Sequence, residues 1–169
     1  HLWKEDIELM KQLGLKNYRT SISIARVMTK EGKPNMKGLD WYKRYFESMT
    51  EAGITVFATL YHWELPMYLH NKGGWKNRDI TDVMAEHAKI VHTHLGKYIE
   101  EYFLINEPLQ FTLDSYHTGW DAPYEKDLQA GLTTVHHALL AQGKMFQTIR
   151  GLDKKAKIST TFNPFVLYA

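Results

Sequence analysis

The sequence contains no cysteine in 169 residues. This absence excludes disulfide bonds and every metal site that is built from thiolate ligands. It also fits a reducing compartment, so we expect a cytoplasmic location. No metal or cofactor is expected, because the histidines fall at spacings that give poor metal-ligand geometry.

Strong net charge and long apolar runs are also missing. The formal net charge is only +2, which is too small to indicate a nucleic acid or a membrane surface as a partner. No apolar run approaches the roughly 18 residues that a membrane-spanning helix needs. The first six residues are too charged for a signal peptide. We expect the chain to begin inside a fold.

Aromatic residues are plentiful by contrast, with five Trp and ten Tyr. Hydrophobic residues make up 44% of the chain and charged residues 24%, which is typical of a globular domain. On composition alone, a large core is favoured over a surface that stacks against sugar rings or bases, and both interpretations remain open.

Helical and strand patterns alternate along the chain. Apolar residues recur at helical spacing in four segments, and short β-branched or apolar runs follow each of them. Asn35 can cap the second helix. In the fourth helix we expect one apolar stripe to be buried: Leu128, Leu132, Val135, Leu139 and Phe146. The helices are predicted at about 7–13, 36–52, 80–95 and 126–150, and the strands at 18–24, 54–61, about 101–106 and about 157–162.

Strict alternation of this kind calls for a parallel sheet. A doubly wound sheet usually carries a glycine-rich phosphate loop, and neither G-x-G-x-x-G nor G-x-x-x-x-G-K occurs here. Polar and aromatic residues gather instead after the strands, where TIM barrels hold their chemistry. Four strands are half of the eight required. We therefore predict an α/β fold in which residues 1–169 are a fragment of one (β/α)₈-barrel domain, roughly strands two to five. An unusual half-barrel that pairs with another chain is the alternative.

One polar cluster follows the third predicted strand, as Asn106-Glu107-Pro108. A carboxyl group at the end of a buried strand is desolvated by its apolar neighbours, which raises its pKa and suits it to donate a proton. A surface glutamate at the start of a loop is the alternative, and for a single Glu it is the commoner one.

A second cluster, His62-Trp63-Glu64, ends the preceding strand in the same way. A neutral histidine can donate to a sugar hydroxyl, and an indole ring offers an apolar face to a pyranose. A core histidine and a packing tryptophan remain equally open for this cluster alone. Because the two clusters end successive parallel strands, they are expected to lie at the same edge of the sheet, which favours a functional site over two unrelated sets of packing residues.

Five ordered segments resemble the family 1 glycoside hydrolases, which comprise β-glucosidases, β-galactosidases and 6-phospho-β-glycosidases. The resemblance covers the whole chain in the family's order. The segments are Glu5-Asp6-Ile7-Glu8-Leu9-Met10-Lys11, Tyr18-Arg19-Thr20-Ser21-Ile22-Ser23, Leu60-Tyr61-His62-Trp63-Glu64-Leu65-Pro66, Gly73-Gly74-Trp75-Lys76-Asn77-Arg78 and Ile105-Asn106-Glu107-Pro108.

The resemblance implies roles for four residues of the two clusters. Glu107 matches the catalytic acid/base, and Asn106 matches the residue that holds the sugar 2-hydroxyl. His62 matches the histidine that contacts the 3-hydroxyl, with Trp63 beside it in the glycone pocket. Because the 6-phospho members often have Phe at that position, Trp63 favours an unphosphorylated glucoside or galactoside.

Two further residues are matched outside these clusters. Arg19 corresponds to the arginine that sits under the nucleophile and favours its ionised form, and Asn163 is expected to line the aglycone side. The family's nucleophile lies in a Thr-Glu-Asn-Gly stretch, which does not occur in these 169 residues. The strand-one glutamine and the C-terminal tryptophans that grip the glycone are also missing.

The chain departs from the family pattern at three positions near the expected site. Ile24 stands where a Trp usually follows Ser-Ile-Ser, Tyr102 stands for a Trp before the acid/base, and Tyr124 stands for a Gly after Ala-Pro. We expect these changes to be tolerated and to alter packing.

Three functional hypotheses follow from the residues and the resemblance. The first is a retaining β-glycosidase that acts on a β-linked sugar, of which this chain holds the acid/base and part of the glycone site. The second is a catalytically inactive half-barrel that binds sugar or serves assembly, by self-association or by pairing with the missing half. The third, an α/β enzyme of unrelated chemistry, is disfavoured by the motifs.

Overall fold

A computed structural model describes residues 2–163. Its four strands form one sheet in the order β1-β2-β3-β4, and every neighbouring pair is parallel. The strands are β1 (Asn17–Ser21), β2 (Thr55–Tyr61), β3 (Ile99–Asn106) and β4 (Lys157–Thr161). Consecutive strands are neighbours, so each connection crosses back over the sheet and the four carboxyl ends share one edge.

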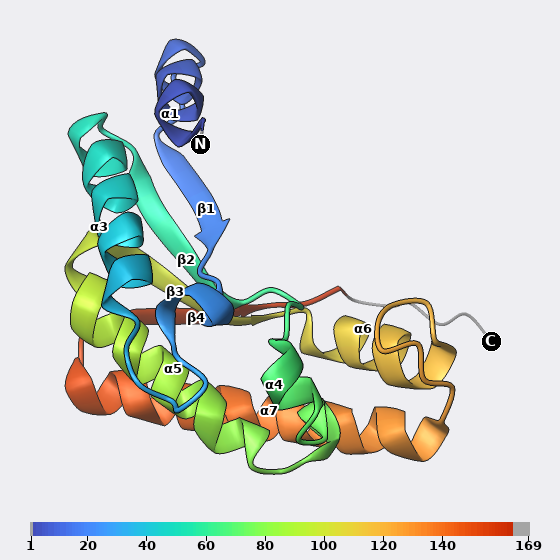
Figure 1. Ribbon diagram of the computed structural model, residues 1–169. Coiled ribbons are helices and arrows are strands. Elements are labelled where there is room, and N and C mark those ends of the chain that lie inside the picture. Colours follow the sequence, from blue (N-terminus) through green and yellow to red (C-terminus); the bar gives the residue numbers. More distant parts are fainter. Residues whose placement is uncertain (1, 164–169) are drawn as a thin grey trace.

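One long helix precedes each strand: α1 (Trp3–Gln12), α3 (Met36–Glu51), α5 (Ile80–Leu95) and α7 (Leu128–Leu152). Helices α3, α5 and α7 follow the convex side of the curved sheet, and no helix covers the concave side in this view (Figure 1). Shorter turns lie in the connections: α2 (Ile24–Val27), α4 (Met67–His70), η1 (Gly74–Lys76), η2 (Gly96–Tyr98), α6 (Pro108–Leu113) and the π-helical turn η3 (Asp114–Thr118).

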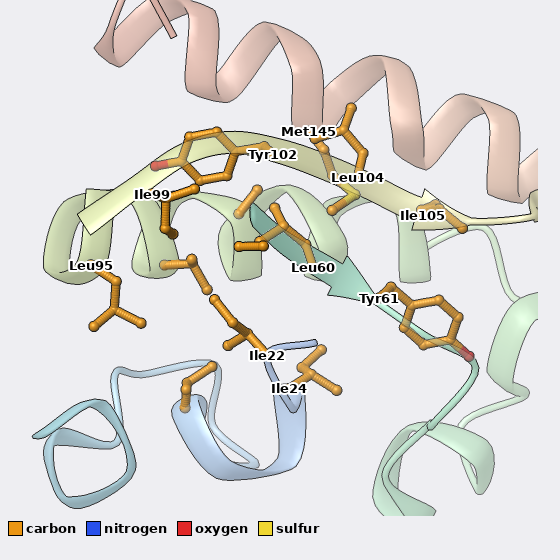
Figure 2. Close-up of a cluster of buried hydrophobic side chains, with 14 of the residues drawn as sticks. Ile22, Ile24, Leu60, Tyr61, Leu95, Ile99, Tyr102, Leu104, Ile105 and Met145 are labelled. Atoms are coloured by element: carbon orange, nitrogen blue, oxygen red, sulfur yellow. The ribbon is translucent and has the colours of Figure 1, made fainter. Parts of the chain in front are cut away.

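The core fills the layer between the sheet and the helices. Val56 and Leu60 of β2 are fully buried, and so are Tyr102 and Leu104 of β3. Figure 2 shows Leu104 facing Met145 of α7. Burial of each such side chain stabilises the fold by about 1.5–3 kcal/mol, so the convex face is the main source of stability.

The concave face of the sheet has a different character. Phe57 and Phe103 are only partly buried there, with ring centroids 6.4 Å apart. The Arg19 guanidinium lies over the Phe103 ring, 5.3 Å from its centroid. Polar side chains and half-covered rings therefore line this side.

Strand β3 carries an irregularity close to its carboxyl end. Phe103 pairs with Ser159 of β4, whereas Asn106 pairs with Thr161, so three steps along β3 match two along β4. An extra residue of this kind re-aims the side chains that follow it. It brings Asn106 opposite Thr161.

The first predicted strand was too long. β1 ends at Ser21, and Ile24–Val27 forms the short helix α2 instead. The backbone N–H groups of Arg26 and Val27 both donate to the carbonyl of Ser23, at 3.0 and 3.2 Å. Ile24 is fully buried, so its apolar side chain serves a helix that packs on the core and not a strand.

The predicted buried stripe of the last helix was also wrong. Leu128, Leu132, Leu139 and Phe146 are exposed by 42–56%, and Val135 is only partly buried. The buried face carries smaller residues: Gly131, Thr134, His137, Ala138, Ala141, Met145 and Ile149. Small side chains let neighbouring elements approach closely, as at Gly131, where an added Cβ would lie 2.8 Å from the His117 Cβ.

Helix capping differs from the prediction as well. Asn35 precedes α3, but its side chain does not cap the helix and Nδ2 donates to the Arg26 carbonyl at 2.9 Å. Asp127 caps α7 by accepting the Ala130 N–H at 2.9 Å. Across residues 2–163, no helix has the length and apolar character to span a bilayer.

Candidate functional site

The carboxyl edge of the sheet holds a hydrogen-bond network centred on Asn106. This side chain is 3% exposed. Its Oδ1 accepts from Arg19 Nη1 of β1 at 3.0 Å and from Thr161 Oγ1 of β4 at 3.1 Å. Because both donors hold the oxygen, the amide orientation is fixed and Nδ2 becomes the end that is offered to a ligand.

Glu107 follows directly and joins the same network through its backbone. Its N–H donates to Thr161 Oγ1 at 3.1 Å. Its backbone is left-handed, with φ of +46°, and Pro108 begins α6 immediately after it. A left-handed non-glycine residue costs about 1–3 kcal/mol, and such residues cluster at functional sites. The side chain is intermediate between buried and exposed, so its burial is less complete than the sequence suggested.

His62 and Trp63 reach the edge from the end of β2. Trp63 Nε1 donates to the Asn106 carbonyl at 2.8 Å, which joins the two sequence clusters directly. Desolvation, and next the charge of Arg19, lower the pKa of His62 from its usual 6.5, while Glu107 acts in the opposite direction. A lowered pKa favours the neutral imidazole at pH 7, which has one N–H that can donate to a sugar hydroxyl and one nitrogen that can accept.

Asn163 lies apart from this network. Its Nδ2 donates to Gln110 Oε1 on α6 at 3.3 Å, and the residue is exposed. The structure therefore brings Arg19, Asn106 and Glu107 together with the His62–Trp63 pair, whereas Asn163 contacts the helix that follows Glu107. Its expected place on the aglycone side stays a prediction.

Sequence reasoning missed two threonines. Thr161 links Asn106 to the Glu107 backbone, and the fully buried Thr59 accepts from Arg19 Nη1 at 3.4 Å. One signal was available, because Ser159, Thr161 and Asn163 alternate along the last strand and alternate side chains share a face. Nothing comparable marks Thr59 in its apolar run.

The three departures from the family pattern have distinct structural roles. Ile24 is fully buried. Tyr102 is buried, its hydroxyl lies 2.8 Å from His92 Nδ1, and burial raises its pKa. Tyr124 is 66% exposed and has a left-handed backbone with φ of +63°, a conformation in which glycine is unstrained.

Within the described part of the chain, no three His, Asp or Glu side chains gather closely enough to hold a metal ion.

Comparison with known proteins gives the family. The profile of Glycosyl hydrolase family 1 matches residues 1–168. The chain belongs to glycosyl hydrolase family 1. Beta-glucosidase A of Acetivibrio thermocellus is 42% identical over 164 residues, which cover 96% of this chain and 37% of that protein. Beta-glucosidase A of Thermotoga maritima is 39% identical over 162 residues, or 95% of this chain and 36% of that protein.

Solved family 1 structures show the same fold. The Thermotoga maritima β-glucosidase in complex with castanospermine superposes with a TM-score of 0.93 at 38% identity, over 97% of this chain and 38% of that one. The four-stranded α/β fold is thus part of the family's TIM barrel, as the sequence predicted. The chain spans little more than a third of the length of these relatives.

Proposed function

We propose that this chain supplies the acid/base and part of the glycone site of a retaining β-glucosidase. The observation that supports the proposal is that the same hydrogen-bond network fixes Asn106 and Glu107. One hydroxyl, Thr161 Oγ1, bonds the Asn106 side chain and the Glu107 backbone, while Arg19 donates to the same amide oxygen of Asn106. The proton donor Glu107 and the neutral amide Asn106 are thereby both held at the carboxyl edge of the sheet.

The chemistry follows from these positions. Glu107 protonates the departing glycosidic oxygen, and after the aglycone leaves it takes a proton from the water that attacks the sugar. Asn106 Nδ2 donates to the 2-hydroxyl, and neutral His62 donates to a second hydroxyl of the same ring. Trp63 places an apolar face beside the pyranose.

A retaining reaction needs a second carboxylate about 5–5.5 Å from the first, to attack the anomeric carbon. The Thr-Glu-Asn-Gly stretch that carries it in the family is not among these 169 residues. We therefore expect the isolated chain to show no turnover of an aryl β-glucoside above that of its Glu107→Gln variant. Hydrolysis by the isolated chain that this variant abolishes would contradict the expectation.

A chimera tests the proposal directly. Residues 1–168 replace the matching segment of the Thermotoga maritima β-glucosidase, which retains the rest of its own barrel. We expect the chimera to hydrolyse 4-nitrophenyl β-glucoside and Glu107→Gln to lower kcat/KM at least a hundredfold. Glu100→Gln, an exposed glutamate on the same strand, is the matched control and should leave the rate unchanged. Equal activity of both variants would refute the proposal.

A second candidate function is a catalytically inactive module that pairs with another chain. The exposed apolar residues of α7 and the half-covered Phe57 and Phe103 favour it, because apolar surface of this kind marks interaction sites. Size-exclusion chromatography with light scattering would detect self-association, and co-expression with the remaining part of the Thermotoga enzyme would detect pairing. The cytoplasmic location expected from composition stays a prediction.

A further inference from the structure

A pocket of about 330 Å³ opens beside the candidate site, between the connection that follows β2 and the turn η3. Neither Glu107 nor Asn106, Arg19 or His62 lines it. Two lining residues link it with the proposed site: Trp63 donates to the Asn106 carbonyl, and the Phe111 backbone N–H donates to the Glu107 carbonyl at 3.2 Å. The pocket is thus a separate cavity that shares one wall with the glycone side.

Three buried rings form the floor of this pocket. Tyr61, Trp75 and Phe111 pack at centroid distances of 5.1–5.4 Å with interplanar angles of 59–67°. Trp75 Nε1 donates to Tyr61 Oη at 2.9 Å, so the polar tips of both rings are already paired. The Trp75 carbonyl is bonded to His137 of α7 at 2.8 Å. The floor is therefore rigid and presents apolar ring surface.

The mouth of the pocket is formed by exposed apolar side chains. Met67 is 67% exposed and Tyr124 is 66% exposed, and both line the opening together with Trp63. Among the described residues that line the pocket, none is Asp, Glu, Lys or Arg. His70 is the one ionisable side chain of the lining apart from the tyrosines, so a charged ligand would find few partners, whereas a flat neutral ring would meet aromatic surface on several sides.

Backbone strain is concentrated at the same place. In residues 2–163, three non-glycine residues have positive φ: Trp63 at +75°, Glu107 at +46° and Tyr124 at +63°. Glu107 is the proposed acid/base, and the other two are walls of this pocket, contributed by different connections. Since residues under such strain cluster at functional sites, a strained, exposed tyrosine at a pocket mouth is a candidate for a role in binding.

The geometry points to a binding site for a neutral planar aryl group, with the Tyr124 ring as its outer wall. The ring is either the aglycone of an aryl glycoside or a free phenol. Binding of a free phenol does not depend on the proposed function, whereas binding of an aglycone rests on the proposed function.

Titration of the isotopically labelled 169-residue chain with phenol, followed by NMR, tests the pocket itself. We expect saturable shifts of the Trp63 and Trp75 indole N–H signals and of the Met67 methyl signal, with a Kd of about 1–10 mM. Benzoate, which has a similar ring and a charge, should bind several-fold more weakly. Absent shifts, or shifts confined to the exposed side of α7, would overturn the inference.

Tyr124 variants then separate binding from a structural role. Tyr124→Gly should weaken phenol binding about fivefold and raise the thermal midpoint by about 2 °C, because glycine relieves the left-handed strain. Tyr124→Phe keeps the ring and should match the parent in both measurements. An unchanged Kd with a lowered midpoint would show that Tyr124 serves the fold alone. Should Tyr124→Gly not fold, the NMR shifts that phenol causes in the unsubstituted chain decide whether the pocket binds the ring.

Glycoside probes distinguish the two sources of the ring. Phenyl β-D-thioglucoside should bind more tightly than phenol if the pocket receives an aglycone, and its advantage should vanish in His62→Ala. A chain that takes phenol but gains nothing from the attached sugar supports the pocket as a free-phenol site and counts against the glycone site. A chain that binds methyl and phenyl thioglucosides equally, with no phenol shifts, supports the glycone site and overturns the pocket.

Discussion

The two faces of the sheet differ in what their residues do. On the convex face, Leu60 and Leu104 are fully covered by helices and serve packing. On the concave face, Arg19 and Phe103 remain partly open, and the polar network at the carboxyl edge contains the buried Asn106. Stability and chemistry are thus divided between opposite sides of the same strands, so a substitution on one side should leave the other property largely intact.

The largest expected effect tests the chemical side. In the chimera, Glu107→Ala should lower kcat/KM for a substrate with a poor leaving group by about 10³-fold or more, since that oxygen depends on a proton from the enzyme. For 2,4-dinitrophenyl β-glucoside the loss should be less than tenfold, because this leaving group departs unprotonated. Rates across a series of aryl glucosides measure the difference. An equal loss throughout would remove Glu107 from the acid role.

A matched pair on adjacent positions of β3 compares the faces directly. Leu104→Ala on the convex face should lower the free energy of unfolding by about 3 kcal/mol. Phe103→Ala on the concave face should cost about 1 kcal/mol, although it removes a larger side chain, because its ring is already partly exposed. Urea denaturation of the three proteins gives both values. A larger loss from Phe103→Ala would show that the concave face is covered in solution.

Acid should lower the free energy of unfolding through His87, which lies in the layer between the sheet and the helices. This residue is fully buried on α5, bonds the Leu60 carbonyl at 2.8 Å, and burial lowers its pKa from 6.5 to about 4. The unfolded chain takes up the proton first, so this contribution is complete above pH 6.5 and declines by up to about 3 kcal/mol as the pH falls to 4.

His87→Gln provides the comparison for this pH effect, because the glutamine amide can still donate to the carbonyl. The free energy of unfolding of the variant should vary less with pH between 6.5 and 4, with about one proton fewer taken up on unfolding. Parallel curves for the two proteins would contradict the predicted titration of His87.

The smallest expected effect concerns Thr161, which contributes to both the sheet edge and the site. Thr161→Val keeps the shape and removes both hydrogen bonds, so kcat/KM of the chimera should fall about fivefold to tenfold. Thr161→Ser, which retains the hydroxyl, should recover most of the loss. Failure of serine to recover activity would indicate that the methyl group, and not the hydroxyl, is what the site needs.

Much of this arrangement could be predicted from the sequence, because it depends on local patterns. Helical and strand periodicity located all four strands and the long helices, and the Asn106-Glu107-Pro108 motif placed a carboxylate at a strand end. The exposed stripe of α7 could not be predicted in this way. Periodicity identified an apolar face, but the face that packs is the one whose small residues, such as Ala138 and Ala141, allow close approach.

Long-range relations were equally beyond the sequence. The bond from Trp63 to the Asn106 carbonyl joins residues 43 positions apart, and no local pattern predicts it. The left-handed backbone of Tyr124 became visible only in the structure, although its place opposite a family glycine was an available signal. The pocket floor depends on Tyr61, Trp75 and Phe111, three rings from separate segments whose meeting is decided by tertiary packing.

The irregular pairing at the end of β3 has a consequence for how the site arises. With uninterrupted pairing from Phe103 and Ser159, Ile105 would stand opposite Thr161 and the amide of Asn106 would lose its hydroxyl partner. The placement of Asn106 opposite Thr161 is therefore a property of the register between β3 and β4.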